Sequence, residues 1–426
     1  MEEISIEKNK INKNLSSKNA LELLDKNDLI DRILQLEAHI NQLKNIIKKS
    51  EADDRKKTKR KKSDRPFDFA NCQKRHILLK FYYLGWNYHG FVEQEDTINT
   101  IEHYIFEALK RSCLIENRET SNYHRCGRTD KGVSAFSQVI SLNVRSKLIA
   151  ENQENINEEL SYCKILNKIL PRDIKCTAWA PVNDVYSARF DCKQRMYKYF
   201  FPRGNLSIDN MNTAAKYLIG HHDFRNICKM DVANGVTTFE RTIDDAKVVC
   251  LKENSQEQSG YDMCQLIIQS RAFLWHQIRC IMSILLLVGK RKEKPEIFLD
   301  LFDINKCPSR PQYNLAHELP LNLYHCEYDD VEWIHDQEDT IIVIKTLQED
   351  WTNNAIKAEM IKNMIDDLEN NLSSDDLNNY QANCLIQGVQ SKVYQPLMKR
   401  LTCASLENRI KHLTKKRKID IKTQSN

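Results

Sequence analysis

Residues 125–135 read Arg-Cys-Gly-Arg-Thr-Asp-Lys-Gly-Val-Ser-Ala, and this stretch says more about the fold and function than any other part of the chain. Glycine is scarce, with 10 in 426 residues, yet Gly127 and Gly132 bracket the polar centre of the stretch. Because glycine permits tight backbone turns, the spacing predicts a shaped loop that holds Asp130 against a ligand.

Three cations, Arg125, Arg128 and Lys131, lie close to Asp130 along this loop. A carboxylate beside cations ionises readily, so it can act as a base or a nucleophile at neutral pH. Most charged runs of this kind are ordinary surface turns, and composition alone leaves that interpretation open.

The segments around the loop carry a mixture of strand and helix patterns. Ile77–Leu84 is rich in β-branched and aromatic residues, and residues 140–145 alternate between apolar and polar, as in a strand with one solvated face. Thr100–Leu114 and Gln277–Val288 have helical spacing. Without a regular strand–helix–strand rhythm, the pattern predicts an α+β fold of two subdomains with mixed, mainly antiparallel sheets flanked by helices.

Composition divides the chain into four parts. We predict an N-terminal coiled-coil helix and basic linker in residues 1–65, a catalytic subdomain with the Asp130 loop in 66–200, a second catalytic subdomain in 201–335, and a helical extension with a flexible insertion and a disordered basic tail in 336–426.

The N-terminal part contains an a/d seam, formed by Leu29, Ile33, Leu36, Ile40, Leu43 and Ile47. Isoleucine at a and leucine at d favour a parallel two-stranded coiled coil, and therefore a homodimer or a coiled-coil partner. So short a seam is marginal by itself, and an amphipathic helix packed on its own domain is an equally good interpretation.

Charge is nearly balanced, with 64 Lys and Arg against 59 Asp and Glu, but cations cluster at residues 55–62 and 415–418. Such clusters contact phosphates, direct nuclear import or solvate a tail. Import is slightly favoured, so we expect residence in the nucleus and the cytoplasm.

The 14 cysteines include no Cys-x-x-Cys, and no two lie within ten positions of each other, so we expect reduced thiols and no metal site. The longest apolar run, Ile281–Val288, is too short to cross a bilayer, so we expect no membrane partner.

Residues 125–135 resemble the catalytic loop of the TruA-like pseudouridine synthases, in which Gly-Arg-Thr-Asp precedes Gly-Val-x-Ala. Further stretches match this family in the right order, and together they cover roughly Arg75 to Tyr328: residues 81–91, 187–190 with 195–199, 220–224, 273–279 and 319–324. Lys131 and Ser134 stand where bacterial members commonly carry a small residue and a histidine. The eukaryotic branch that acts on tRNA positions 38 and 39 carries this lysine and serine. The predicted N-terminal helix and the tail at 387–397 and 405–410 are also similar to that branch.

The resemblance implies isomerisation of uridine to pseudouridine in the anticodon stem-loop of tRNA, without a cofactor and with the uridine flipped from its stack. It implies these roles: Asp130 is the catalytic carboxylate, Arg128 fills the vacated space, Arg125 and Lys131 contact RNA, Tyr197 stacks on the flipped base, Arg279 pairs with Asp130, and Leu323 forms an apolar pocket wall. Taken singly, Tyr197 is more typical of an ordinary core aromatic, Arg279 is typical of a surface residue, and Leu323 looks like any core leucine.

Aromatic residues are dense between Tyr82 and His89, where they serve RNA stacking or core packing. Three other functions remain open: a related synthase with another RNA target, a catalytically silent tRNA-binding chaperone, and a coiled-coil scaffold.

Overall fold

The computed structural model describes residues 67–148, 155–251, 259–373 and 393–424, together with residues 25, 29, 30, 33 and 37. The chain separates into two compact units, Met1–Phe67 and Asp68–Asn426. In the first unit, residues 29, 30, 33 and 37 are helical. The other seam residues and the basic linker lie outside the described residues, so the coiled coil stays a prediction.

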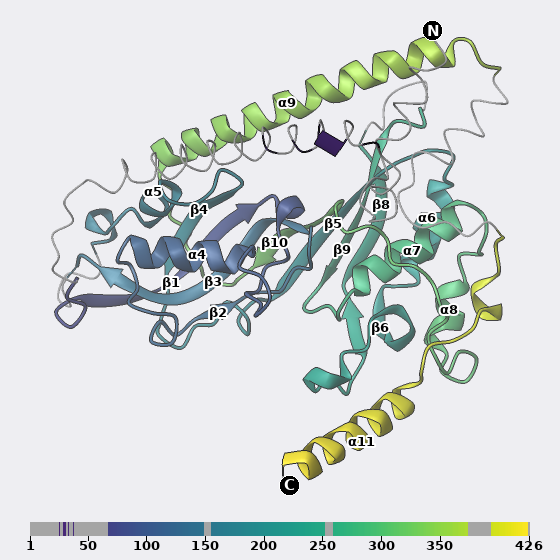
Figure 1. Ribbon diagram of the computed structural model, residues 1–426, viewed down its shortest axis with the longest axis horizontal. Helices are drawn as coiled ribbons and strands as arrows, with labels where there is room; N and C mark the ends of the chain where they lie inside the picture. The colour runs from purple at the N-terminus through teal and green to yellow at the C-terminus, as the bar shows by residue number, and fades with distance from the viewer. Residues whose placement is uncertain are drawn as a thin grey trace. The chain divides into compact units, whose positions relative to one another are not determined.

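The second unit is built on one mainly antiparallel sheet with the strand order β4-β1-β3-β10-β5-β9-β8, in which β2 adds to β3 (Figure 1). The strands are β1 Gln73–Tyr83, β2 His124–Arg125, β3 Ser134–Ser146, β4 Ile174–Pro181, β5 Gln194–Pro202, β8 Asp245–Cys250, β9 Met263–Ser270 and β10 Leu321–Glu327; β6 Gly220–Asp223 and β7 Glu240–Ile243 form a small second sheet. The predicted α+β class with a mainly antiparallel sheet is confirmed.

A single parallel pairing holds the two halves of the large sheet together. β10 runs parallel to β3 on one side and antiparallel to β5 on the other. The expected boundary between residues 200 and 201 falls within β5. Main-chain hydrogen bonds therefore continue from one predicted subdomain into the other.

Helices cover the sheet where its residues are apolar on both faces. β1 is buried from Ile77 to Tyr83 except at Lys80, a pattern typical of a central strand. The described helices are α4 Ile101–Arg111, α5 Tyr162–Asn167, α6 Ile208–Lys216, α7 Gln277–Gly289, α8 Ile297–Phe302, α9 Gln337–Glu369 and α11 Leu406–Gln424. α7 buries residues around most of its circumference, as expected for a helix inside a core. None of the described helices is long and apolar enough to span a membrane.

The long helix α9 extends from α5 and β4 toward the β8–β9 end of the sheet (Figure 1). Near its start Asp339 accepts a hydrogen bond from Asn167 at 2.5 Å, and near its end Tyr261 donates a hydrogen bond to Glu369. α9 therefore contacts both halves of the unit that contains the large sheet. Of the predicted flexible insertion at 370–379, residues 374–379 lie outside the described residues.

The C-terminal segment packs against the core and then forms a helix. Leu397 is fully buried, and its amide donates to Glu293 at 2.6 Å. The prediction that the basic tail is disordered is wrong for residues 415–418, because they lie within α11. Lysine and arginine are good helix formers, which the prediction from charge alone ignored.

The structure also contains a disulfide between Cys250 and Cys264, which face each other on β8 and β9. The expectation that all thiols are reduced is therefore wrong at this pair, because strand pairing brings together two cysteines that are distant in sequence.

Candidate active site

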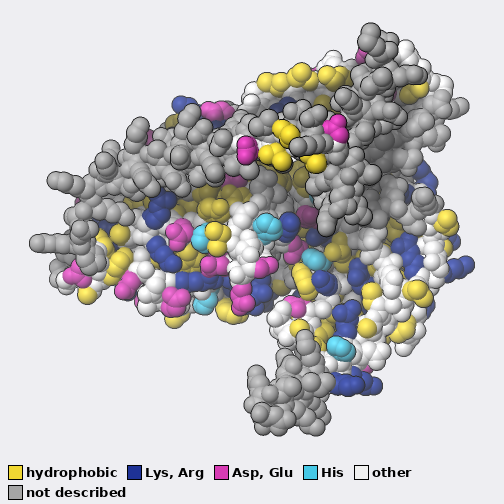
Figure 2. Space-filling view, in the orientation of Figure 1, with side chains coloured by type: hydrophobic (Ala, Val, Ile, Leu, Met, Phe, Trp, Pro, Cys, Tyr) yellow, Lys and Arg dark blue, Asp and Glu magenta, His cyan; other side chains and the backbone are white. Residues whose placement is uncertain are grey.

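A cleft of about 1320 Å³ opens beside the 125–135 loop. Its lining includes eight cationic side chains (Arg125, Arg128, Lys131, Arg189, Arg195, Arg241, Arg271 and Arg279) and five acidic ones (Asp130, Asp231, Glu240, Asp244 and Glu318). Lys, Arg and His side chains gather, with some acidic ones, near the middle of the face shown in Figure 2. This excess of cations in a concave site suits a polyanionic ligand.

Main-chain hydrogen bonds fix the loop that carries Asp130. Phe91 donates from its amide to the carbonyl of Thr129 at 3.1 Å, and Gly132 donates to the carbonyl of Tyr88 at 3.1 Å. Gly132 has a φ of +77°, a conformation that favours glycine. The 81–91 stretch is therefore the support of the loop, which explains why the two motifs occur together.

The aromatic residues of the 81–91 stretch divide between the two predicted roles, which are core packing and stacking on RNA. Tyr82, Tyr83 and Tyr88 are buried, so they pack in the core. Trp86 is 47% exposed and His89 is exposed, and His89 also lines the cleft. Of these aromatic residues, Trp86 and His89 therefore have the exposed rings that the predicted stacking on RNA needs.

Asp130 is 30% exposed in the cleft, and His276 Nε2 lies 3.3 Å from its Oδ2. His276 precedes α7 with a φ of +58°, which is rare for a residue with a side chain. Burial lowers the pKa of His276 below its ordinary value, and the nearby Asp130 only partly opposes this shift. At neutral pH the imidazole is therefore uncharged, and it lies beside Asp130 as a neutral polar group.

Arg279 is not placed as the sequence predicted. Its Nη2 forms an ion pair with Glu318 at 2.7 Å, and its Nε donates to the carbonyl of Ala316 at 2.8 Å. Among the described residues, the side chain recorded beside the Asp130 carboxylate is that of His276 instead. The segment before β10 supplies both partners of Arg279, and this contact between distant segments is invisible in the sequence.

Glu318 nevertheless connects Arg279 to the catalytic loop. A Cβ on Gly132 would lie 2.8 Å from Glu318 Cγ, so the acid packs directly on the loop. Arg279 therefore supports the loop that carries Asp130 through Glu318.

Tyr197 and Leu323 occupy paired positions on β5 and β10. Tyr197 lines the cleft and meets Phe273 edge to face, with 5.2 Å between ring centroids. Burial raises the pKa of Tyr197 well above its ordinary value, so its phenol keeps its proton at neutral pH. Leu323 is fully buried and does not line the cleft, whereas Leu321 does, so the apolar wall was predicted two residues too late.

The three loop cations differ in their surroundings. Arg128 and Lys131 are exposed and line the cleft. Arg125 also lines it, but its Nη1 pairs with Glu102 at 2.8 Å. Arg125 thus has a structural partner in addition to its predicted contact with RNA.

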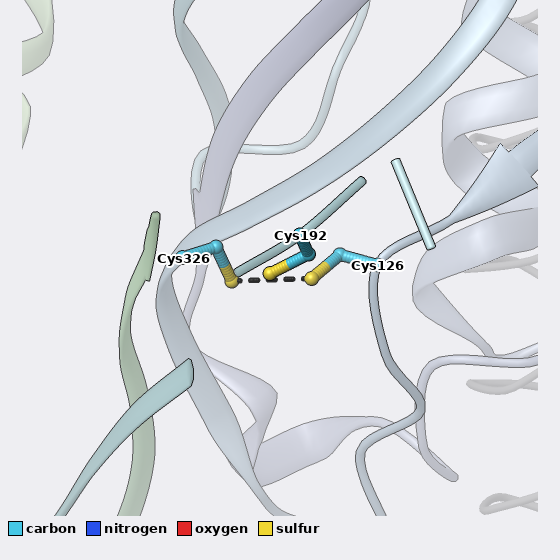
Figure 3. A group of neighbouring side chains, drawn as sticks. All are labelled: Cys126, Cys192 and Cys326. Atoms are coloured by element: carbon cyan, nitrogen blue, oxygen red, sulfur yellow. Dashed lines mark hydrogen bonds between the residues drawn. The ribbon is translucent and has the colours of Figure 1, made fainter. Parts of the chain in front are cut away.

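One group of side chains among the described residues has the composition of a metal site: Cys126, Cys192 and Cys326 (Figure 3). Burial by itself raises the pKa of the Cys126 thiol, but hydrogen bonds with the other two cysteines and the charge of Arg195 hold that pKa well below its usual range. The sequence prediction missed this group because it considered only short spacings.

The sequence prediction also missed His276 and Glu318 as parts of the site. His276 lies within the matched stretch 273–279 and Glu318 directly precedes the matched stretch 319–324. A histidine or a glutamate in such a stretch indicates a site only when its partner is known, and here the partners come from distant loops.

Comparison with known proteins agrees with this geometry. Residues 214–329 match the family model of tRNA pseudouridine synthases. The chain is 43% identical to a tRNA pseudouridine(38/39) synthase of Homo sapiens over 92% of this chain and 88% of the relative. It is 41% identical to those of Bos taurus, over 95% and 91%, and Saccharomyces cerevisiae, over 76% and 74%. With such identity across most of its length, and an aspartate-bearing loop at a basic cleft, the chain belongs to the tRNA pseudouridine synthase family.

Proposed function

We propose that this protein isomerises uridine to pseudouridine at positions 38 and 39 of the tRNA anticodon stem-loop, with Asp130 as the catalytic carboxylate. The observation that carries the proposal is the partly exposed Asp130 in a cleft whose lining contains more cationic than acidic side chains. The names of the human, bovine and yeast relatives support the choice of positions.

The reaction breaks the bond between ribose C1′ and uracil N1 and forms a bond between C1′ and C5, while C5 loses a proton and N1 gains one. Atoms and electrons balance within the nucleotide, so the reaction consumes no second substrate. It needs an ionised carboxylate close to the sugar and the base, and attack on the base, attack on C1′ and removal of a sugar proton all use such a group. Asp130 supplies it in each case.

A uridine in a folded stem-loop must leave its stack to reach Asp130, at a cost of roughly a few kcal/mol. Arg128 and Lys131 are exposed at the cleft, so they can meet phosphates and the space that the base leaves. Tyr197 offers a ring surface to the extruded base. Because its phenol holds its proton strongly, we assign Tyr197 to stacking rather than to removal of the C5 proton.

The decisive experiment compares the wild-type chain with Asp130→Asn on an unmodified tRNA transcript, with no added cofactor. We expect the variant to lose at least about 10³-fold in single-turnover rate, as for removal of a catalytic base, and to keep tRNA affinity within about threefold. Chemical mapping of pseudouridine identifies the converted positions, and a gel-shift assay measures affinity.

Asp231→Asn is the matched control, because Asp231 is another carboxylate that lines the same cleft. It should keep nearly full activity. Conversion retained in Asp130→Asn would overturn the assignment of the catalytic residue. Tight tRNA binding without conversion by the wild-type chain would favour the silent chaperone, and conversion restricted to other uridines would favour a synthase with another target.

We also propose that the chain forms a homodimer. Two features support this: the a/d seam between Leu29 and Ile47, and the exposed apolar side chains of α9, which include Trp351, Met360 and Met364. Light scattering of the whole chain and of a chain lacking residues 1–65 tests the role of the seam. A monomer at all concentrations would contradict the proposal.

The basic clusters support the proposal of nuclear as well as cytoplasmic residence. Replacing residues 55–62 and 415–418 by neutral residues in a fluorescent fusion should reduce the nuclear fraction. An unchanged distribution would leave the clusters to contact RNA or solvent.

A further inference from the structure

We propose that Cys126, Cys192 and Cys326 bind one zinc ion beside the catalytic loop. The three thiols come from distant parts of the chain and are each 3% exposed or less. Figure 3 shows their sulfur atoms turned toward one another. The inference concerns metal binding and does not depend on the proposed tRNA activity.

The spacing of the sulfur atoms fits a tetrahedral zinc centre. Cys126 Sγ lies 3.4 Å from Cys326 Sγ, and all three sulfur atoms lie within 4.8 Å of one another. A Zn–S bond of about 2.3 Å places the sulfurs of such a centre roughly 3.8 Å apart. Shifts of less than about 1 Å would therefore bring all three sulfurs into position, and each thiol would release its proton as it binds the metal.

The charge next to the thiols also points to an anionic centre. Arg195 is 8% exposed, and its recorded side-chain hydrogen bonds go to the main-chain carbonyls of Cys126, Arg189 and Arg271. Among the described ion pairs, none joins Arg195 to a carboxylate. A buried guanidinium without a counter-charge is costly. Zinc with three thiolates carries one net negative charge, which would neutralise Arg195.

The site has a route of entry and room for a fourth ligand. Cys126 and Cys192 line the cleft, so a hydrated ion can reach the thiols from that side. Among the described residues, the group offers three ligands, and we expect a water molecule from the cleft at the fourth position.

The three ligands belong to the segments that build the active site. Cys126 lies four residues before Asp130, Cys326 pairs with Arg195 across β10 and β5, and β5 also carries Tyr197. A bound zinc ion would therefore tie the start of the catalytic loop to β10 and to the segment that directly precedes β5. Its expected role is structural, because it holds the loop in place.

Two alternatives to metal binding are that the thiols simply fill the core and that they form a disulfide. Buried cysteines commonly act as small apolar side chains, and Cys163 and Cys176, which are also buried, are examples in this chain. Those two lack a third cysteine among the described residues. The experiment must therefore separate metal binding from packing and from oxidation.

The test titrates the reduced full-length protein with Co²⁺ and follows the sulfur-to-metal charge-transfer absorption. We expect one equivalent to bind and zinc to displace it. Cys192→Ser and Cys326→Ser should each weaken binding by more than the roughly 10–100-fold that loss of an outer-sphere partner produces. Cys280→Ser, a buried cysteine in α7 outside the group, should bind as the wild type does.

A second measurement uses the wild-type chain, so that misfolding of a variant cannot obscure the result. Zinc should slow alkylation of Cys126 and Cys192 by N-ethylmaleimide at least tenfold, and should leave the partly exposed Cys72, Cys113 and Cys403 unchanged. Absence of stoichiometric binding, equal affinity in Cys192→Ser, or equal alkylation rates with and without zinc would overturn the proposal. A Cys126–Cys326 disulfide that persists in protein prepared with a reductant would also overturn the proposal.

Discussion

The two walls of the cleft are built in different ways. On one wall, the 125–135 loop rests on the 85–91 segment through main-chain bonds, and its Arg125 pairs with the buried Glu102. On the other wall, His276 and Arg279 at the start of α7 reach the loop through contacts with Asp130 and Glu318. The first wall is held by main-chain hydrogen bonds and an internal ion pair, whereas the second depends on side chains that meet across the cleft.

The buried acid behind the first wall should have the largest effect on stability. Glu102 is 1% exposed and pairs with Arg118 at 3.0 Å and Arg125 at 2.8 Å. Glu102→Ala leaves two partly buried guanidinium groups without their partner, and we expect a loss of about 3 kcal/mol in the free energy of unfolding, measured in urea. Glu93→Ala is the control, because the 46% exposed Glu93 contacts the same Arg118 and should cost less than about 1 kcal/mol.

The same acid predicts a pH dependence. Burial opposes ionisation of Glu102, but hydrogen bonds from Tyr123 and the Glu93 amide and the charges of Arg125 and Arg118 prevail and lower its pKa below 4.5. A lowered pKa in the folded state means that this stabilisation is complete above pH 4.5 and is lost as the pH falls through the folded value. Glu102→Ala should remove this part of the acid unfolding profile. An unchanged profile would show that Glu102 does not control it.

The next largest effect should come from Gly85, where the supporting segment touches the loop. A Cβ on this residue would lie 1.9 Å from the carbonyl oxygen of Val133, so Gly85→Ala must displace backbone. We expect a loss of about 2 kcal/mol in stability and a severe loss of activity, because the loop that carries Asp130 moves. Gly127→Ala is the control for stability, since its nearest contact would be Tyr197 Oη at 4.0 Å. Equal stability losses would contradict the close approach.

The two walls also show what the sequence can predict. The loop, its glycines, β1, α4 and α7 were predictable because local patterns encode them. The pairing of Arg279 with Glu318, the contact of His276 with Asp130 and the group of three cysteines were not predictable. Each needs two or three segments from different parts of the chain, and only the packed sheet brings these segments together. The place of Leu323 in the core depended in the same way on strand register.

The arginine on the second wall provides the next test. Arg279→Lys removes a planar guanidinium that bonds both Glu318 and the Ala316 carbonyl, and we expect about a tenfold loss in kcat/KM on tRNA. Glu318→Gln should produce a similar loss, and the double variant should lose little more, because both changes break one contact. Losses that multiply in the double variant would instead indicate that Arg279 acts on Asp130 separately from Glu318.

The smallest effect should come from His276. Because its pKa is lowered, wild-type His276 is neutral at pH 7, and His276→Gln keeps a neutral hydrogen-bonding group beside Asp130. The glutamine amide keeps a polar contact with Asp130 in poorer geometry, which we expect to cost about 0.7 kcal/mol, or about a threefold decrease in kcat/KM that stays constant between pH 6.5 and 8. If a charged imidazole were needed instead, wild-type activity would fall as the pH rises through this range, and the variant would be inactive throughout. A pH profile of both proteins distinguishes the two cases. The first outcome would show that activity depends less on His276 than on the wall that carries Asp130.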